Sequence, residues 1–111
     1  MADADLLVIM APDLAARVAD WRRSLADVRR VSTRTVEAYD RDVEGFVRFL
    51  TGYQGRPPTL ADIAALQPAD YRAFLARRRK DGIAAASLAR TLAGIRSLVR
   101  FLERSGQATS A

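Results

Sequence analysis

The sequence contains neither cysteine nor histidine. Without cysteine the chain can form no disulfide, no thiolate nucleophile and no thiolate-ligated metal site. Without histidine it lacks the commonest general base near neutral pH and the commonest protein metal ligand. Its acidic residues form no cluster suited to a metal ion. We therefore expect no metal, no cofactor and no catalytic residue in this chain.

The sequence also lacks a long apolar run. The apolar stretch at residues 6–10 is far shorter than the roughly 20 residues of a membrane-spanning helix. It follows Asp3 and Asp5 rather than a basic segment, so it does not resemble a signal peptide. A length of 111 residues fits one domain. We expect a cytoplasmic protein with no membrane partner.

Basic residues are in excess, with 18 Lys and Arg against 13 Asp and Glu and a net charge of +5. All of the basic residues except Lys80 are arginines. Arginine makes planar, two-pronged contacts with phosphate and with guanine, and a basic excess favours polyanions as partners. A GC-rich genome would produce the same bias toward arginine. The placement of the arginines must therefore decide between the two explanations.

Apolar residues recur at the three- and four-residue spacings of amphipathic helices, and no alternating strand pattern of useful length occurs. Capping residues, prolines and glycines mark the helix ends, among them Ser32, Thr59 and Pro68, with Gly82 at a left-handed position. The sequence predicts an all-α bundle of four main helices and one short helix, at about 12–29, 33–51, 60–66, 68–80 and 85–104.

We expect residues 12–106 to form the domain. Residues 1–11 lack capping signals and are predicted to be a flexible N-terminus. Residues 107–111 are small and resemble the start of an interdomain linker. Aromatic residues on apolar helix faces are predicted to be core, whereas Tyr53, flanked by glycines, is predicted to be exposed; the expected core aromatics are Trp21, Tyr39, Tyr71 and Phe74.

In the helix at 33–51, Arg34, Arg41 and Arg48 share one outward line because seven residues make nearly two helical turns. Glu37 and Glu44 precede Arg41 and Arg48 by four residues, which is the spacing of stabilising helix pairs. The spacing therefore favours a salt-bridged solvated face over DNA contact for these two arginines, and Arg41 is kept as a candidate for DNA contact. Arg34 lies in the first turn, where free backbone N–H groups can meet an anion.

The helix at 85–104 is strongly cationic, with Arg90, Arg96, Arg100 and Arg104 opposed only by Glu103. We expect Arg90, Arg100 and Arg104 on the side opposite the apolar stripe, with Arg96 at its boundary. The stripe consists of Leu88, Leu92, Ile95, Val99 and Leu102. Ala93 and Gly94 lie between these arginines in the sequence, and we expect both to face outward. Small residues flanked by arginine would let the helix approach a major groove closely. A cationic solvated helix is the alternative explanation. Likewise, residues 77–80 either complement a helix dipole or contact phosphate.

Two stretches carry a resemblance. Residues 32–46 fit the pattern Thr-x3-Tyr-x2-Asp-x3-Phe, through Thr35, Tyr39, Asp42 and Phe46. The second stretch runs from Gly82-Ile83 through Ser87-Leu88-Ala89-Arg90 and Leu92-Ala93-Gly94-Ile95-Arg96-Ser97 to Phe101-Leu102 and Ser105-Gly106. Together, over about residues 12–106, they resemble the N-terminal core-binding (SAM-like) domain of tyrosine recombinases, the phage-integrase family, and in particular its Xer subgroup.

The resemblance implies a compact orthogonal bundle that binds double-stranded DNA, with the helices at about 33–51 and 85–104 over the major groove of a recombination half-site. By position, Thr35 and Ser87 would contact phosphates, Arg90 would reach a base edge and Arg96 would contact the DNA backbone. The sequence departs from the family in the run of alanines at 84–86, and in the acidic Glu37 and Glu44 near the expected DNA face. With the arginine placement, the candidate DNA-binding residues are Arg34, Thr35, Arg41, Ser87, Arg90, Arg96 and Arg100.

The family cuts DNA with a nucleophilic tyrosine, two arginines, a lysine and usually histidines, in a C-terminal catalytic domain. This chain has no histidine, so we expect a domain excised from a recombinase, unable to exchange strands and monomeric when isolated. The resemblance implies that the parent resolves chromosome dimers with a second Xer-type recombinase in a tetrameric complex. The alternative is a helical protein–protein interaction domain, whose binding would change little with ionic strength.

Overall fold

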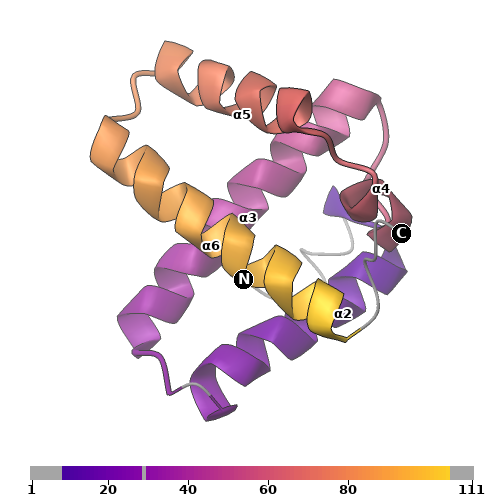
Figure 1. The fold of residues 1–111 in the computed structure, drawn as a ribbon, viewed down its shortest axis with the longest axis vertical. Coiled ribbons are helices and arrows are strands. Elements are labelled where there is room, and N and C mark those ends of the chain that lie inside the picture. Colours follow the sequence, from indigo (N-terminus) through magenta and orange to yellow (C-terminus); the bar gives the residue numbers. More distant parts are fainter. Residues whose placement is uncertain (1–8, 29, 106–111) are drawn as a thin grey trace.

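The computed structural model describes residues 9–28 and 30–105, and the regular structure in this part of the chain is helical. The elements are α2 (Pro12–Arg23), η1 (Ser24–Val28), α3 (Thr33–Gln54), α4 (Leu60–Ala64), α5 (Pro68–Lys80) and α6 (Ala85–Arg104). Helix α6 lies across α3 and also packs on α2, while α5 lies toward the C-terminal end of α3 (Figure 1). The prediction of an all-α bundle is confirmed.

The helix ends follow local capping chemistry. The Ser32 hydroxyl accepts a hydrogen bond from the Thr35 backbone N–H at 3.2 Å, which starts α3 at the predicted residue. Gly55, with φ of 84°, ends α3 three residues later than expected. Thr59 starts α4 as predicted, through a capping box with Asp62. Gly82, with φ of 86°, takes the predicted left-handed position after α5.

The first predicted helix, 12–29, differs from the structure at its end. The α-helix stops at Arg23, and a wider π-helical turn, η1, continues to Val28. The Val31 N–H then donates to the Leu25 carbonyl at 2.9 Å, with Arg30 left-handed at φ of 54°. This is the closure of a helix C-terminus that usually employs glycine. Residue 29 and the side chain of Val28 lie outside the described residues.

The core lies where α2, α3 and α6 meet and extends to Phe74 of α5. Its largest fully buried side chains include Trp21, Phe46 and Phe74. Tyr39 and Tyr71 are half-buried against the core and Tyr53 is 52% exposed, so the predicted placement of the aromatic residues is confirmed.

The N-terminal segment differs from its expectation. Ile9 and Met10 are buried in the core. Ala11 donates its N–H to the Pro58 carbonyl at 2.9 Å, and Thr51 Oγ1 donates to the Ile9 carbonyl at 3.0 Å. The expectation of a flexible segment over 1–11 was therefore wrong for residues 9–11, while residues 1–8 and the expected linker at 107–111 lie outside the described residues. Within residues 9–28 and 30–105, no helix combines the length and apolarity needed to cross a membrane.

Candidate nucleic-acid interface

The side of α6 that faces the core determines which of its residues remain available. Leu88, Ile95 and Leu102 of the predicted apolar stripe are buried, but Leu92 and Val99 are only half-buried. The helix is rotated so that its buried side also includes other residues, namely Thr91, Gly94 and Leu98. Trp21 of α2 helps to fix this rotation of α6, since its Nε1 donates a hydrogen bond to Ser97 Oγ at 3.0 Å.

Gly94 contradicts its prediction. It is buried, and a Cβ added to it would lie 3.1 Å from Cδ1 of Tyr39 on α3. The glycine therefore brings α6 close to α3, and the expectation that it lets α6 approach a DNA groove was wrong. Ala93 is half-buried.

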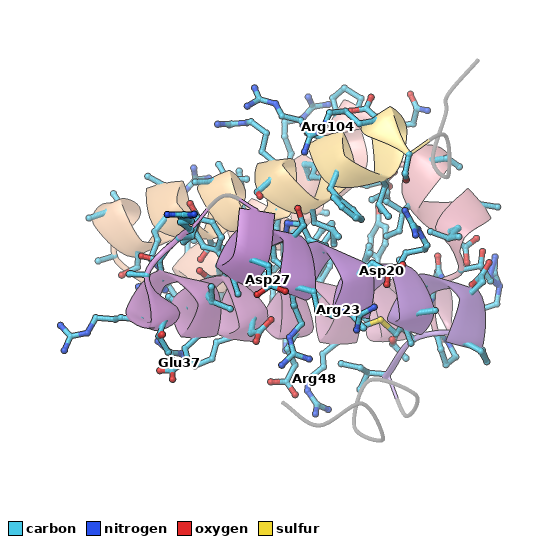
Figure 2. All side chains as sticks on the ribbon, turned by 90° about the horizontal axis from the view of Figure 1, so that it is seen from below. Asp20, Arg23, Asp27, Glu37, Arg48 and Arg104 are labelled. Atoms are coloured by element: carbon cyan, nitrogen blue, oxygen red, sulfur yellow. The ribbon has the colours of Figure 1, made fainter. Side chains whose placement is uncertain are left out.

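The exposed side of α6 changes in character along the helix. Its N-terminal half exposes Ala85, Ala86 and Ala89 together with Arg90, whereas its C-terminal half exposes Arg96 and Arg100. Figure 2 shows Arg104 on this outer side of α6. The expectation that the cationic side of α6 faces away from the core is thus met by its C-terminal arginines.

A hollow of about 300 Å³ lies where α6 meets the start of α3 and the turn after η1. We call it the crossing hollow; its lining includes Val31, Thr35, Tyr39, Arg96, Ser97 and Arg100. Three of the predicted DNA-binding residues, Thr35, Arg96 and Arg100, therefore come together although more than 60 residues separate Thr35 from Arg96 in the sequence. Among residues 9–28 and 30–105, none that lines this hollow carries a carboxylate.

Three polar side chains of the crossing hollow, those of Thr35, Arg96 and Arg100, are available to an anion. Ser32 Oγ donates to Thr35 Oγ1 at 2.9 Å, which leaves the Thr35 hydroxyl proton free to donate elsewhere. Neither Arg96 nor Arg100 forms an ion pair within residues 9–28 and 30–105. Both arginines are exposed and therefore accessible to a large polyanion.

Arg90 is held by a buried carboxylate. Its Nε and Nη2 donate to the two oxygens of Asp42 on α3 at 3.1 and 3.0 Å. The Asp42 side chain is 8% exposed, whereas that of Arg90 remains 49% exposed. The hydrogen bond to Asp42 raises the pKa of Arg90, so the guanidinium stays charged. Asp42 belongs to the Thr-x3-Tyr-x2-Asp-x3-Phe pattern, but its partner could not be read from that pattern.

Like Arg90, three further predicted site residues do not line the crossing hollow. Ser87 is half-buried in the first turn of α6, and Arg34 and Arg41 are exposed on α3. Arg48, which shares the outward line of Arg41, lies on the side of the molecule away from Arg104 (Figure 2). Of the two expected helix pairs, Glu44–Arg48 forms at 3.0 Å, whereas no ion pair joins Glu37 and Arg41, both of which the structure describes.

A second basic hollow, of about 500 Å³, lies between the later half of α3 and α5, and we call it the α5 hollow. Its lining includes Arg48, Phe49, Tyr53, Phe74, Arg77 and Arg78. Its arginines are largely engaged, because Arg48 pairs with Glu44 and Arg77 lies 3.6 Å from Asp81. The guanidinium of Arg78 lies 5.4 Å from the centre of the Phe74 ring. The sequence predicted the cationic end of α5 but not this hollow.

Residues 18–106 match the family model described as phage integrase, N-terminal SAM-like domain. The chain belongs to this family. No solved structure matches the SAM-like domain at a significant level.

Curated relatives of this SAM-like domain are longer recombinases. It is 52% identical over 107 residues to a tyrosine recombinase XerC of Rhizobium meliloti, which covers 96% of this chain and 34% of the relative. The corresponding protein of Agrobacterium fabrum is 50% identical over 107 residues, again with 96% and 34% coverage. That of Brucella suis is 47% identical over 109 residues, with 98% and 35% coverage. The chain thus spans about a third of the length of the curated relatives it matches.

The candidate interface residues of the SAM-like domain fall into two groups that the sequence analysis treated as one. Thr35, Arg96 and Arg100 share the crossing hollow, and Arg90 occupies a separate position against Asp42. The residue that sequence reasoning missed is Asp42. The sequence signal that could have revealed it is a carboxylate on the apolar face of a helix, because a buried carboxylate needs a cationic partner.

Proposed function

We propose that this chain is the DNA-binding domain of a XerC-like tyrosine recombinase and that it contacts a recombination half-site through α3 and α6. The observation that carries the proposal is the crossing hollow. There, two exposed arginines that form no ion pair with the described part of the chain lie beside a threonine hydroxyl at a helix start. This set of donors suits phosphate oxygens.

In this proposal the residues divide by role. Arg96, Arg100, Thr35 and Ser87 contact phosphates and set the position of the domain on the duplex. Arg34 and Arg41, on the outer side of α3, contact phosphates farther along the duplex. Arg90 reaches a base edge in the major groove, where an arginine recognises guanine through two hydrogen bonds.

The relatives suggest the setting in which the domain works. A XerC-like parent would cut and rejoin DNA with a catalytic domain outside this chain, in a tetrameric complex with a second Xer-type recombinase. Its role would be the resolution of chromosome dimers in the cytoplasm. Residues 12–106 would then bind DNA, residues 107–111 would begin a linker, and the isolated domain would be a monomer.

The test is a titration of labelled duplex DNA at a series of salt concentrations. With four to six phosphate contacts, the logarithm of the binding constant should fall against the logarithm of salt concentration with a slope of roughly −4 to −5. Arg96→Ala should make that slope shallower by about 0.9, because one contact is lost. Arg104→Lys, which keeps its charge, serves as the matched control. Binding that does not respond to salt would refute the proposal and favour a protein-interaction domain.

A further inference from the structure

The hydrogen bonds between Arg90 and Asp42 engage only one edge of the guanidinium. A guanidinium can present two forks of N–H groups, one formed by Nε and Nη2 and the other by Nη1 and Nη2. Asp42 accepts from Nε and Nη2, at 3.1 and 3.0 Å. The second fork is left unused by Asp42, and the side chain is still half-exposed.

Asp42 is itself firmly held. It is buried on α3, and its Oδ1 lies 3.0 Å from Thr91 Oγ1 of α6. The Thr91 hydroxyl also lies 2.9 Å from the Ser87 carbonyl oxygen. The carboxylate is therefore fixed between two helices before any ligand arrives, and a guanidinium bound to it has little rotational freedom left.

We propose that Asp42 is a positioning residue that holds Arg90 by its Nε–Nη2 fork, so that its Nη1–Nη2 fork faces a guanine in the major groove. This inference rests on the proposed function. An exposed arginine side chain that no protein group holds must lose conformational entropy when it binds a base with two hydrogen bonds. Asp42 removes part of that loss in advance, and it also fixes the plane in which the fork can meet the O6 and N7 atoms of guanine.

The other exposed arginines of α6 differ in this respect. Arg96 and Arg100 have no carboxylate partner within the described part of the chain. Their guanidinium groups are free to follow phosphates of any sequence. The structure therefore divides α6 into one arginine that reads sequence and others that supply affinity.

The experiment binds the chain to a pool of duplexes of randomised sequence and sequences the bound fraction. The wild type should enrich guanine at one position by about 5- to 150-fold, the discrimination expected of one bidentate pair. Arg90→Ala should abolish that enrichment. Asp42→Asn should reduce it at the same position, because the amide no longer accepts two hydrogen bonds from Arg90. The double variant should match Arg90→Ala, because Asp42 acts only through Arg90.

A matched control separates positioning from general damage to a buried carboxylate. Asp40 is also buried on α3 but pairs with Arg22 of α2, at 3.0 Å from Nε. Asp40→Asn should keep the guanine enrichment. If Asp42→Asn does not fold, Arg90→Lys replaces it as the test, since lysine keeps the charge but offers no fork. The Arg90→Lys variant should lose the guanine enrichment and keep the slope of the logarithm of the binding constant against the logarithm of salt concentration.

The results distinguish failure of this inference from failure of the proposed function. Full guanine enrichment in folded Asp42→Asn, or in Arg90→Lys, would overturn the positioning role while the salt slope still supported DNA binding. Enrichment that survives in Arg90→Ala would show that another residue reads the base, and would also overturn the inference. A wild type that binds no duplex at any salt concentration would overturn both.

Discussion

The crossing hollow and the α5 hollow are both lined by arginines, yet their charges are in different states. In the crossing hollow, Arg96 and Arg100 have no ion pair within residues 9–28 and 30–105. In the α5 hollow, Arg48 and Arg77 each have a carboxylate nearby. The number of arginines in a surface region therefore does not measure its capacity to bind DNA. For contacts to phosphate, what matters is whether acidic groups of the protein already pair with those arginines.

A glycine beside each hollow shows a related difference. Gly94 lies against Tyr39, a core-packed ring that cannot move far. A Cβ at Gly45 would instead overlap the guanidinium of Arg78, the far end of a flexible side chain. Gly94 thus has a structural role in the helix crossing, whereas Gly45 only gives room to a side chain that has other positions available.

The largest expected effect comes from removing the unpaired arginines. Arg96→Ala combined with Arg100→Ala should make the salt slope shallower by about 1.8 and weaken duplex binding about 30-fold at 0.15 M salt, because two phosphate contacts are lost. The matched pair Arg48→Ala with Arg77→Ala removes the same charge from the α5 hollow and should change affinity far less. Equal losses in fluorescence titrations of the two double variants would abolish the distinction between the hollows.

The next effect concerns the two glycines. Alanine favours a helix over glycine by about 1 kcal/mol, but overpacking costs about 1–3 kcal/mol. Gly94→Ala should therefore lower the free energy of unfolding by about 1 kcal/mol, because Tyr39 cannot yield. Gly45→Ala should raise it by about 0.5–1 kcal/mol, because Arg78 can move aside. Urea unfolding measures both, and a shift of the same sign in the two variants would contradict the contrast.

The smallest effect concerns Asp40, a buried aspartate of α3. Burial raises the pKa of Asp40, against the opposing attraction of Arg22. The folded protein therefore binds a proton at Asp40 at a higher pH than the unfolded chain, in which the pKa of aspartate is about 3.9. Between these two pKa values the folded state holds more protons. The contribution of Asp40 to stability consequently grows as the pH falls through this window and is lost as the pH rises.

Urea unfolding of the wild type and Asp40→Asn, repeated from neutral pH down to about 4, tests this sign. The difference in unfolding free energy should shift in favour of the wild type at the acidic end. Curves that run parallel over the whole range would show that Asp40 has an ordinary pKa in the folded state.

Much of the fold could be predicted because helix boundaries depend on nearby residues. Ser32 starts α3 and Gly82 follows α5 as expected, since a cap and a left-handed glycine act within a few residues. The exposure of Arg100 also followed from helical spacing, whereas spacing placed Arg96 only at the boundary of the apolar stripe. The prediction was wrong for Ile9 and Met10, because their burial depends on a groove that other helices build.

The amino-acid sequence by itself determined the order of the helices, the residues that cap them and the cationic character of α6, because each depends on neighbours within a turn or two. Only the tertiary structure decided that Gly94 faces Tyr39, that Asp42 holds Arg90 and that Thr35 lies beside Arg96 and Arg100. These contacts depend on the rotation and crossing of α6 against α3. That rotation is set by how all the buried side chains pack together, so no single stretch of the chain encodes it.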